Sequence, residues 1–500
     1  AGTRPCADTD GLWGLAYYRD NEGRETAVTY LGKQHTPAPN RHGVSGYTLV
    51  RDAAGRVTSM CYVDTNGHTC DTPEGWAQIQ LERHPETGDI LTCSYFDKDG
   101  TPCLSDEGVA TIRMEYDTKG NLIKRSFYGT NDTPCTNRQG VAVETHLPDA
   151  LGRIVETRFL GTDGKPTLST TGMAAVQRKY TPSGVCCEEA YLGVDGKPCT
   201  DRRGISRIVW ESDGQGNDSE AYFGTDGKPT LCKDGYAGLR RRNDPATNRL
   251  STTYLGTDGK PCANRLGVAT VVHESDHRGM ESESYLDAQG LPCVCTKGYA
   301  RIERQYAAQK DVVIHRGRDG ALCLNGDGVA VIVTKTEAGG TQTESYFDKD
   351  NRPTTCTGGY AEVRRVFDKR GNCAEEMYLA LDRMPVETSR GYAKVVKRFN
   401  DRGHMLECSY FNQDDMPCTL PAGYAKEMWS YDENGVPCKV TYCGGSGQVV
   451  SCCGVSSVRY RYDTDGNCVE ELYEDAAGRP CTPAKACFKY DGYGNRLETA

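Results

Sequence analysis

Tyr254-Leu-Gly-Thr-Asp-Gly-Lys-Pro-Cys262 is the stretch that decides the fold, because copies of it return along the whole chain. A second, nearly identical copy is Tyr191-Leu-Gly-Val-Asp-Gly-Lys-Pro-Cys199. The aromatic residues that head the copies follow one another at spacings of 30 to 33 residues. A fixed period of this length predicts a tandem array, in which each unit packs mainly on its neighbours. The predicted repeat anchors are Tyr30, Tyr62, Tyr95, Tyr128, Phe159, Tyr191, Tyr222, Tyr254, Tyr285, Tyr346, Tyr378, Tyr410, Tyr442 and Tyr473, with His315 as a degenerate copy.

One repeat, residues 391–418, shows why each unit should be a β-hairpin. The runs 391–399 and 404–411 are strand candidates, and a Gly-containing turn joins them. Two short strands with such a turn between them are typical of a hairpin. A second turn follows, often Thr-Asp-Gly, where Gly can take a positive φ. The Pro behind it belongs at a strand start or edge, where no donor is needed.

The first strand of a repeat alternates in polarity. In the run 108–116 one face carries Ala110, Ile112, Met114 and Tyr116, while Val109 falls on the other face with Thr111, Arg113 and Glu115. A period of two with one apolar face indicates a half-buried antiparallel strand. The small Ala at the same place in most copies predicts the close approach of a second layer or of the next turn of the spiral.

About thirty strands in succession determine the fold class. The sequence predicts an all-β chain, a tandem array of about 15 hairpin repeats of ~32 residues forming a long antiparallel sheet. Open twisted sheets of more than ~10 strands curl or split, so we expect a coiled sheet: a spiral, a shell or a β-solenoid. We expect residues 1–500 to be one continuous array that begins and ends within a repeat, without a separate catalytic domain.

Composition narrows the functional classes. Hydrophobic residues make up 37% of the chain and Gly contributes 57 residues, which suits thin sheets and frequent turns better than a thick core. The net charge of −10 offers no basic surface for nucleic acid. No apolar run is long enough for a membrane span, and residues 1–6 do not have the pattern of a signal peptide.

Some copies contain an aromatic residue, Asp, two variable residues, Gly and Asn. Examples are Tyr116-Asp-Thr-Lys-Gly-Asn121, Tyr462-Asp-Thr-Asp-Gly-Asn467 and Tyr490-Asp-Gly-Tyr-Gly-Asn495. The last part of the chain resembles the tyrosine–aspartate repeats of the Rhs family. The resemblance implies a long antiparallel sheet that spirals into a shell, and a shell of that family can enclose a toxin. The Asp-Gly-x-Pro-Cys element is not part of that family's pattern.

The chain has 25 cysteines, most of them just after the Pro of the repeat or just before the anchor. If the Asp-Gly turn centres a hairpin, cysteines on its two sides can approach each other. The candidate disulfide bonds are Cys61–Cys70, Cys93–Cys103, Cys408–Cys418 and Cys468–Cys481. Such bonds would imply an oxidising compartment. The alternative is that Cys serves as a small buried apolar residue.

Other candidate chemistry is sparse. Glu stands two residues before six anchors, so a row of carboxylates and aromatic rings could bind glycans, or could form cross-strand ion pairs with Arg and Lys. These residues are Glu189, Glu220, Glu283, Glu344, Glu376 and Glu471. Asp97-Lys-Asp-Gly100 lacks the further ligands of a calcium loop and reads as a turn. No Cys-x-x-Cys, nucleophile motif or phosphate loop occurs in the sequence.

The sequence therefore predicts a non-enzymatic structural repeat array without metal or cofactor. It would be a segment of a large bacterial surface, secreted or filament-forming protein, located outside the cell or on its surface. The alternatives are a glycan-binding adhesive module and an Rhs-like shell around a toxin. The expected partners are other copies in end-to-end assembly, glycans or host-surface components, and not nucleic acid.

Overall fold

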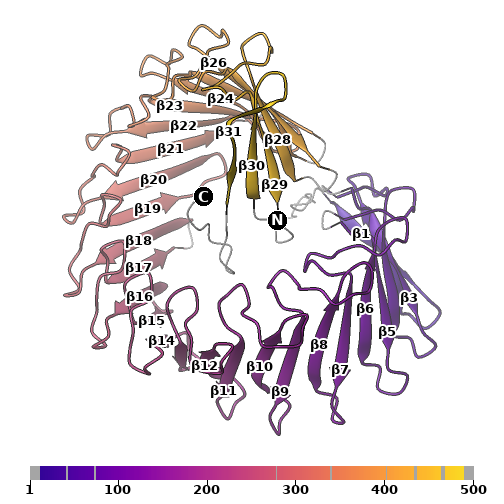
Figure 1. The fold of residues 1–500 in the computed structure, drawn as a ribbon. Coiled ribbons are helices and arrows are strands. Elements are labelled where there is room, and N and C mark those ends of the chain that lie inside the picture. Colours follow the sequence, from indigo (N-terminus) through magenta and orange to yellow (C-terminus); the bar gives the residue numbers. More distant parts are fainter. Residues whose placement is uncertain are drawn as a thin grey trace. The chain divides into compact units, whose positions relative to one another are not determined.

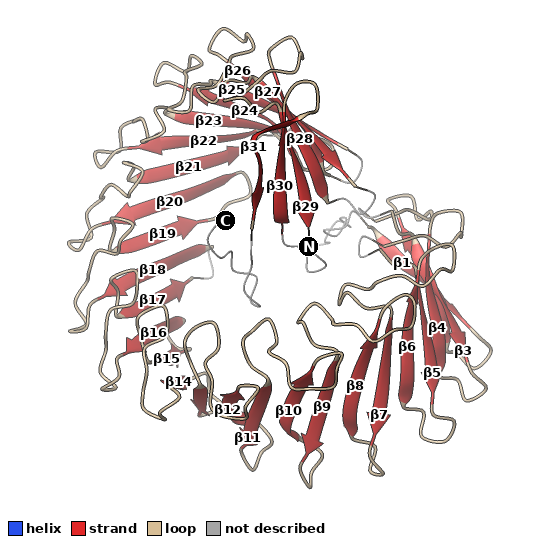
Figure 2. Cartoon of the chain, viewed as in Figure 1, coloured by secondary structure: helices blue, strands red, loops and turns tan. Residues whose placement is uncertain are grey.

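The computed structural model describes residues 12–488, apart from 41–42, 73–74, 277–278, 338–339, 401–402, 433–435 and 463–467. These residues form 31 β-strands and no helix, which confirms the all-β prediction (Figure 2). The chain divides into two compact units at Arg202 and Arg203. Each unit is described by itself.

The first unit holds twelve strands, which lie side by side in chain order (Figure 1). They are β1 (Gly14–Arg19), β2 (Glu25–Leu31), β3 (Gly46–Arg51), β4 (Val57–Val63), β5 (Gln78–Arg83), β6 (Ile90–Phe96), β7 (Thr111–Tyr116), β8 (Leu122–Tyr128), β9 (Val143–Pro148), β10 (Ile154–Leu160), β11 (Ala175–Tyr180) and β12 (Cys186–Leu192). Each strand pairs antiparallel with the next one, as in a meander.

The second unit holds the remaining nineteen strands in the same antiparallel order. They are β13 (Arg207–Ser212), β14 (Asp218–Phe223), β15 (Gly238–Asp244), β16 (Arg249–Leu255), β17 (Thr270–Ser275), β18 (Met280–Leu286), β19 (Arg301–Gln305), β20 (Lys310–Arg316), β21 (Val331–Thr336), β22 (Gln342–Phe347), β23 (Glu362–Phe367), β24 (Cys373–Leu379), β25 (Lys394–Phe399), β26 (Met405–Phe411), β27 (Lys426–Tyr431), β28 (Pro437–Cys443), β29 (Ser457–Tyr462), β30 (Cys468–Glu474) and β31 (Pro480–Cys487).

Three tight turns complete each repeat. The first turn joins the two strands: the Asp117 carboxylate accepts the backbone N–H groups of Lys119 and Asn121, and Gly120 has a φ of 84°. The tyrosine before this Asp links neighbouring hairpins: the Tyr116 hydroxyl in β7 donates to the Ile90 carbonyl in β6, 3.0 Å away. This arrangement gives the Tyr-Asp-x-x-Gly-Asn pattern a structural cause.

The second turn contains the Asp-Gly-x-Pro-Cys element. Gly193 N–H donates to the Lys197 carbonyl, Pro198 lies opposite Leu192, and Cys199 N–H donates to the carbonyl of the anchor Tyr191. Pro therefore stands at a short antiparallel bridge, as the sequence predicts. The Asp97 carboxylate likewise accepts N–H groups of its own turn, from Asp99 and Thr101, as the turn interpretation of that motif requires.

The third turn leads into the next repeat. Asn137 N–H donates to the Val141 carbonyl, and Gly140 N–H donates back to the Asn137 carbonyl. After it come a buried apolar residue and the small residue that precedes the strand, such as Val141 and Ala142, which are 0% and 1% exposed. The Ala142 carbonyl accepts the Phe127 N–H, which extends the pairing with the adjacent strand; the predicted approach of another layer at this Ala stays a prediction.

The core of each repeat lies where the second and third turns cover one face of the strands. One buried cluster joins Val271 and Ile302 of the first strands, the anchor Tyr285, the proline-following Cys293 and the third-turn Tyr299. The predicted polarity of 108–116 holds within β7, but Val109 was assigned to the wrong side. It is 0% exposed, because it lies ahead of the strand, in the third-turn segment that packs into the core.

Candidate functional site

The anchors form a continuous row of rings together with the residues that follow the third turns. In the second unit the row runs Tyr346, Tyr360, Tyr378, Tyr392, Tyr410, Tyr424 and Tyr442, with ring centroids 4.8 to 6.1 Å apart. A shorter row in the first unit runs Tyr47, Tyr62, Trp76 and Tyr95. Contacts at these separations stabilise beyond the area they bury, so the rows tie successive repeats together.

Except at Tyr47, which belongs to β3, the ring between two anchors of these rows comes from the motif Gly-Tyr-Ala or Gly-Trp-Ala, which was not among the predicted anchors. The motif places Tyr299 between Tyr285 and His315, at 5.8 and 4.7 Å. His315 is 3% exposed and takes the anchor's place, and burial lowers the pKa of its imidazole. In other repeats Val268 or Val329 follows the third turn instead, and these are also buried.

One predicted anchor is corrected. Phe127, and not Tyr128, occupies the anchor place, because Cys135 N–H donates to the Phe127 carbonyl and Phe127 is 1% exposed. Tyr128 points to the opposite face, where the Arg113 guanidinium lies 4.1 Å from its ring centroid. Two adjacent aromatic residues made the register of this copy ambiguous by one position.

The carboxylates two residues before the anchors accept hydrogen bonds from the anchor hydroxyls. The Tyr222 hydroxyl donates to Glu220 at 2.7 Å, and the Tyr285 hydroxyl donates to Glu283 at 2.9 Å. Burial, followed by the neighbouring carboxylate, raises the pKa of both phenols. The rings therefore stay protonated and remain donors. The same bond joins Tyr191 to Glu189, Tyr346 to Glu344, Tyr378 to Glu376 and Tyr473 to Glu471.

A cation from the next strand completes the row in several repeats. Arg304 lies 3.1 Å from Glu283, and Lys397 lies 2.6 Å from Glu376. Burial works to raise the pKa of Glu376, but Lys397, Arg365 and Tyr378 outweigh it, so its pKa is lowered. These cross-strand pairs are the second of the two interpretations of the Glu row. The Glu oxygens are engaged inside the array, which disfavours their use on sugar hydroxyls.

Glu427 departs from this scheme. It occupies the strand place that Val395 holds one repeat earlier, and it accepts bonds from Tyr424 at 2.7 Å, Tyr410 at 3.3 Å and the Trp429 indole at 3.2 Å. Three neutral aromatic donors thus surround one carboxylate within the row.

The third turns of successive repeats also bond to one another. Thr170 N–H donates to the Gln139 carbonyl at 2.8 Å, Arg265 N–H to Asp234 at 3.0 Å, and Ser389 N–H to Gly358 at 3.0 Å. Each bond spans one repeat. A depression of about 430 Å³ lies beside these turns, over the rings of Tyr360 and Tyr378 and next to Arg390.

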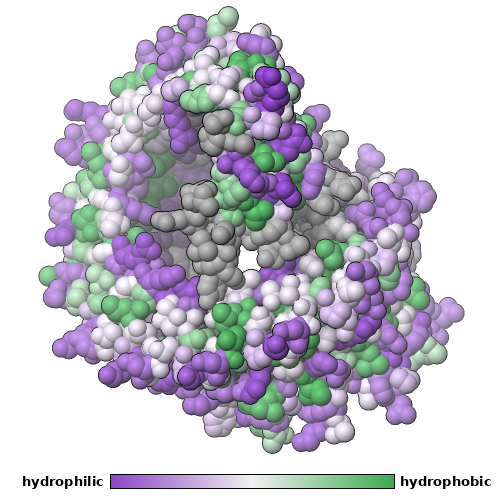
Figure 3. Space-filling model, viewed as in Figure 1, coloured by the Kyte–Doolittle hydropathy of each residue, from purple (hydrophilic) through white to green (hydrophobic). Residues whose placement is uncertain are grey.

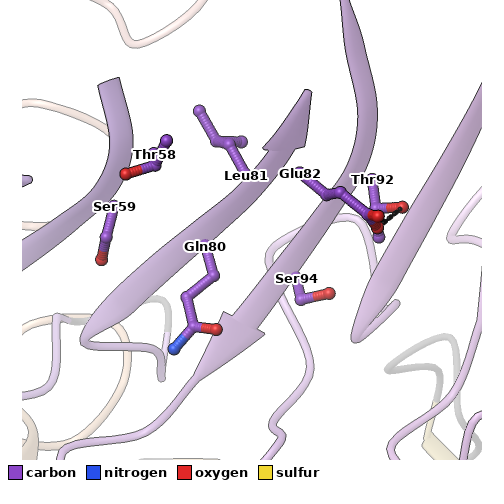
Figure 4. Close-up of a pocket in the computed structure, with 7 residues that line it drawn as sticks. All are labelled: Thr58, Ser59, Gln80, Leu81, Glu82, Thr92 and Ser94. Carbon is purple, nitrogen blue, oxygen red and sulfur yellow. Dashed lines mark hydrogen bonds between the residues drawn. The ribbon is translucent and has the colours of Figure 1, made fainter. Parts of the chain in front are cut away.

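The opposite face of the sheet carries short polar side chains as well as the apolar residues that directly follow the anchors, such as Phe223 and Phe411. Ser94 and Thr111 share a hydrogen bond at 3.1 Å, and Thr253 and Thr270 share one at 3.0 Å. A shallow depression of about 410 Å³ lies over β4, β5 and β6 (Figure 4). In it Ser59 and Gln80 point away from Leu81, and the Thr92 hydroxyl donates to Glu82. Figure 3 shows hydrophobic residues scattered over the visible surface rather than gathered in one large patch.

The cysteines of the described residues are free thiols, and Cys6 lies outside those residues. The Cys70 N–H donates to the Tyr62 carbonyl, and the Cys70 side chain shares the face of Tyr62. Cys61 stands next to Tyr62 in β4, so alternation turns its side chain to the opposite face, away from Cys70. Cys468 lies five residues before Tyr473, at the far end of β30 from Cys481. Cys93–Cys103 and Cys408–Cys418 lie on shared faces, and their bridging stays a prediction.

Within the described residues no group of three or more His, Cys, Asp or Glu side chains is arranged to hold a metal ion. No helix that is long and apolar enough to cross a membrane occurs in the described part of the chain. The features that could carry a function are therefore the row of aromatic rings, the row of Glu side chains with their Arg and Lys partners (the charged row), and the third turns that bond to one another.

No family model matches the chain, and no curated protein matches it. Among solved structures, the crystal structure of TcdB2-TccC3-TEV aligns at 14% identity and a TM-score of 0.33, covering 96% of this chain and 25% of that one. TcdB2-TccC3 without its hypervariable C-terminal region aligns at 12% identity and a TM-score of 0.27, covering 97% and 28%. The Photorhabdus luminescens Tc holotoxin pore aligns at 12% identity and 0.25, covering 97% and 27%. The chain spans about a quarter of the length of these chains, and its function has to be argued from its own residues.

Proposed function

We propose that this chain is a non-enzymatic wall segment of a larger β-repeat protein. The observation that carries the proposal is the bonding of many third turns to the third turn one repeat before, as in Arg265 to Asp234 and Thr296 to Leu266. Such bonds add cohesion along the array and present no reactive group. In an array of this kind, stability is approximately a sum of repeat and nearest-neighbour contributions.

The side chains that could do chemistry support the same proposal. Glu283 is held by Tyr285 and Arg304, and Glu376 by Tyr378 and Lys397. The phenols of this row are buried donors with raised pKa values. A carboxylate with its hydrogen bonds already made, beside a protonated phenol, is poorly placed to act as a general base.

The two faces of the sheet suit a wall. One face is covered by second and third turns over an apolar core, and the other carries short polar side chains such as Ser94, Thr111 and Thr253. A wall that separates an enclosed volume from its surroundings can present different chemistry on its two faces, as this sheet does. We therefore favour a shell-forming wall over a filament, and we place the assembled protein at the cell surface or outside the cell.

Electron microscopy of the complete protein tests this function. Hollow particles would support the shell-forming wall. Uniform rods would favour the filament, and compact particles without a lumen would overturn the wall proposal. Glycan binding by the same protein that is abolished by Glu283→Gln, with the β-sheet circular dichroism retained, would instead support an adhesive module.

A further inference from the structure

Two places in the second unit set a cysteine that opens a four-residue third turn beside a cysteine of the next repeat; at a third place, where Cys481 Sγ lies 3.1 Å from the Gly454 carbonyl oxygen, the turn that opens with Cys452 is shorter. Cys232 opens a third turn, whose Gly235 N–H donates to the Cys232 carbonyl at 2.9 Å. The Sγ of Cys262, one repeat later, lies 3.9 Å from the Gly235 carbonyl oxygen. The sulfur of one repeat thus rests on the four-residue turn that begins with a cysteine of the repeat before.

The same geometry recurs two repeats further along. Gly298 N–H donates to the Cys295 carbonyl at 2.9 Å, and the Sγ of Cys323 lies 3.7 Å from the Gly298 carbonyl oxygen. Cys323 also packs against the buried cluster that contains Cys295. The recurrence shows that the register of the repeat, and not a local irregularity, sets this approach.

Burial and mutual charge act on both pairs. Cys232 and Cys295 are 7% and 5% exposed. Burial raises the pKa of Cys262 and Cys323, and each is raised further by nearby Asp and by the facing cysteine, Cys232 and Cys295 respectively. Cys262 and Cys323 are therefore close enough to their counterparts to feel their charge.

We infer that Cys232–Cys262 and Cys295–Cys323 are sites for disulfide bonds between consecutive repeats. The oxidant is a small-molecule disulfide. The partly exposed thiol, Cys262 or Cys323, loses its proton and attacks one sulfur of that disulfide, releasing the first small thiol. The facing cysteine, after losing its proton, attacks the mixed disulfide and releases the second. Two protein thiols and one small disulfide become one protein disulfide and two small thiols.

These bonds differ in effect from bonds within a hairpin. Each closes a loop of about 30 residues and so restricts the separation of neighbouring repeats, whereas a hairpin bond closes only about ten. The Cys232–Cys262 disulfide would add to the backbone hydrogen bond between the same two third turns, from Arg265 to Asp234. The array would thus be reinforced where two repeats meet.

The chain supplies its own controls. Cys199 makes the same contact, with its Sγ 3.6 Å from the Gly172 carbonyl oxygen, but the turn there opens with Ser169. Cys418 lies 3.6 Å from the Gly391 carbonyl, and that turn opens with Thr388. At these positions the geometry is present and the second sulfur is absent.

The test is disulfide mapping of the full chain. The folded protein is incubated with oxidised glutathione at about pH 8.5, near the ordinary thiol pKa, alkylated, and digested without reduction. Mass spectrometry should find peptides linked through Cys232–Cys262 and Cys295–Cys323 as the main links, which dithiothreitol releases. Predominant links at other pairs would overturn the inference. So would Cys262 and Cys323 that carry only glutathione or remain free.

Variants make the result specific. Cys262→Ser should leave Cys232 free and keep the Cys295–Cys323 link, whereas Cys199→Ser should leave both links unchanged. Ser169→Cys should add a third link, to Cys199, because it places a second sulfur in the same geometry. Failure of Ser169→Cys to form this link in folded protein would show that the register does not bring the two positions together.

Discussion

Arg125 and Glu144 form an ion pair of reversed polarity in the charged row. Arg125 Nη1 lies 3.3 Å from Glu144 Oε2. In several repeats the second strand supplies the acid, as Glu376 does, and the next strand supplies the base, as Lys397 does. Here the second strand supplies Arg125, and the acid occupies a place that Val176 holds one repeat later. Glu144 is 8% exposed, and its other charged neighbour, His146, lies 3.8 Å away with the pKa of its imidazole lowered by burial.

Removal of Arg125 should therefore cost more than removal of the pair. Arg125→Met leaves a buried carboxylate without its cation, and we expect a loss of about 3–5 kcal/mol in the free energy of unfolding. Glu144→Val restores the aliphatic residue of other repeats and should be close to neutral. The double variant should recover most of the loss of Arg125→Met. Urea unfolding of all four proteins measures the coupling, and additive effects would contradict the pairing.

The first turns should be sensitive to acid. The Asp149 carboxylate is bonded to Arg153 Nε at 2.7 Å and to the backbone N–H of Leu151 at 2.8 Å. The side-chain bond from Arg153 contributes most to the lowered pKa of Asp149. A carboxyl group whose pKa is lower in the folded state stabilises the fold above its ordinary pKa. That contribution is lost as the pH falls from about 3.8 downward.

Asp149→Ala should therefore lower the melting temperature at pH 7, and the difference from the unchanged protein should vanish in strong acid. Thermal unfolding followed by circular dichroism across this pH range checks the expectation. Asp163→Ala is a matched control in a second turn, because Asp163 bonds only to Lys165 N–H, at 3.0 Å, and has a weak ion pair with the Lys165 amine at 3.8 Å. A difference at Asp149 that persists below the pKa would show that packing, not charge, is responsible.

Much of this architecture could be predicted because residue preferences over a few neighbouring positions determine it. Period-two alternation marked the strands, and Gly196 and Pro198 marked a turn and a bridge through their own backbone preferences. The anchors followed from the period. The one misplaced anchor, Tyr128, stands beside Phe127, and only the hydrogen bonds of the sheet distinguish the two.

The contacts between repeats could not be predicted from those signals. The third-turn bonds and the approach of Cys262 to Gly235 join residues 27 to 31 positions apart in different loops. No local preference encodes such an approach. The Gly-Tyr-Ala motif was a usable signal, because a large aromatic residue between Gly and Ala, as at Tyr392, needs a covered place to pack.

The aromatic row should be a main source of cohesion. Tyr392 is 7% exposed and its ring lies 5.7 Å from Tyr378 and 5.2 Å from Tyr410. Tyr392→Ala should cost about 3–5 kcal/mol, as for other large buried residues, and Tyr392→Val should cost less because Val329 fills the equivalent place. Tyr306→Ala, at a position that is 48% exposed, is the control and should have little effect. Equal losses for Tyr392 and Tyr306 would contradict the role of the row.

Deletion of one whole repeat, with the strand register preserved across the new junction, should leave a folded array. Deletion of residues 238–269 joins Ala237 to Thr270, which recreates the existing junction between Ala269 and Thr270. Tyr285 would then take the place of Tyr254 beside Tyr236, so the turns and the ring row continue without a gap. Because each repeat contacts mainly its neighbours, we expect an unchanged β-sheet spectrum and a melting temperature within a few degrees. Deletion of residues 238–253, which removes β15 and most of β16, breaks this register and should give aggregated or partly unfolded protein. Equal loss of structure in both deletions would mean that the second unit depends on contacts beyond nearest neighbours, and the array description of its stability would be wrong.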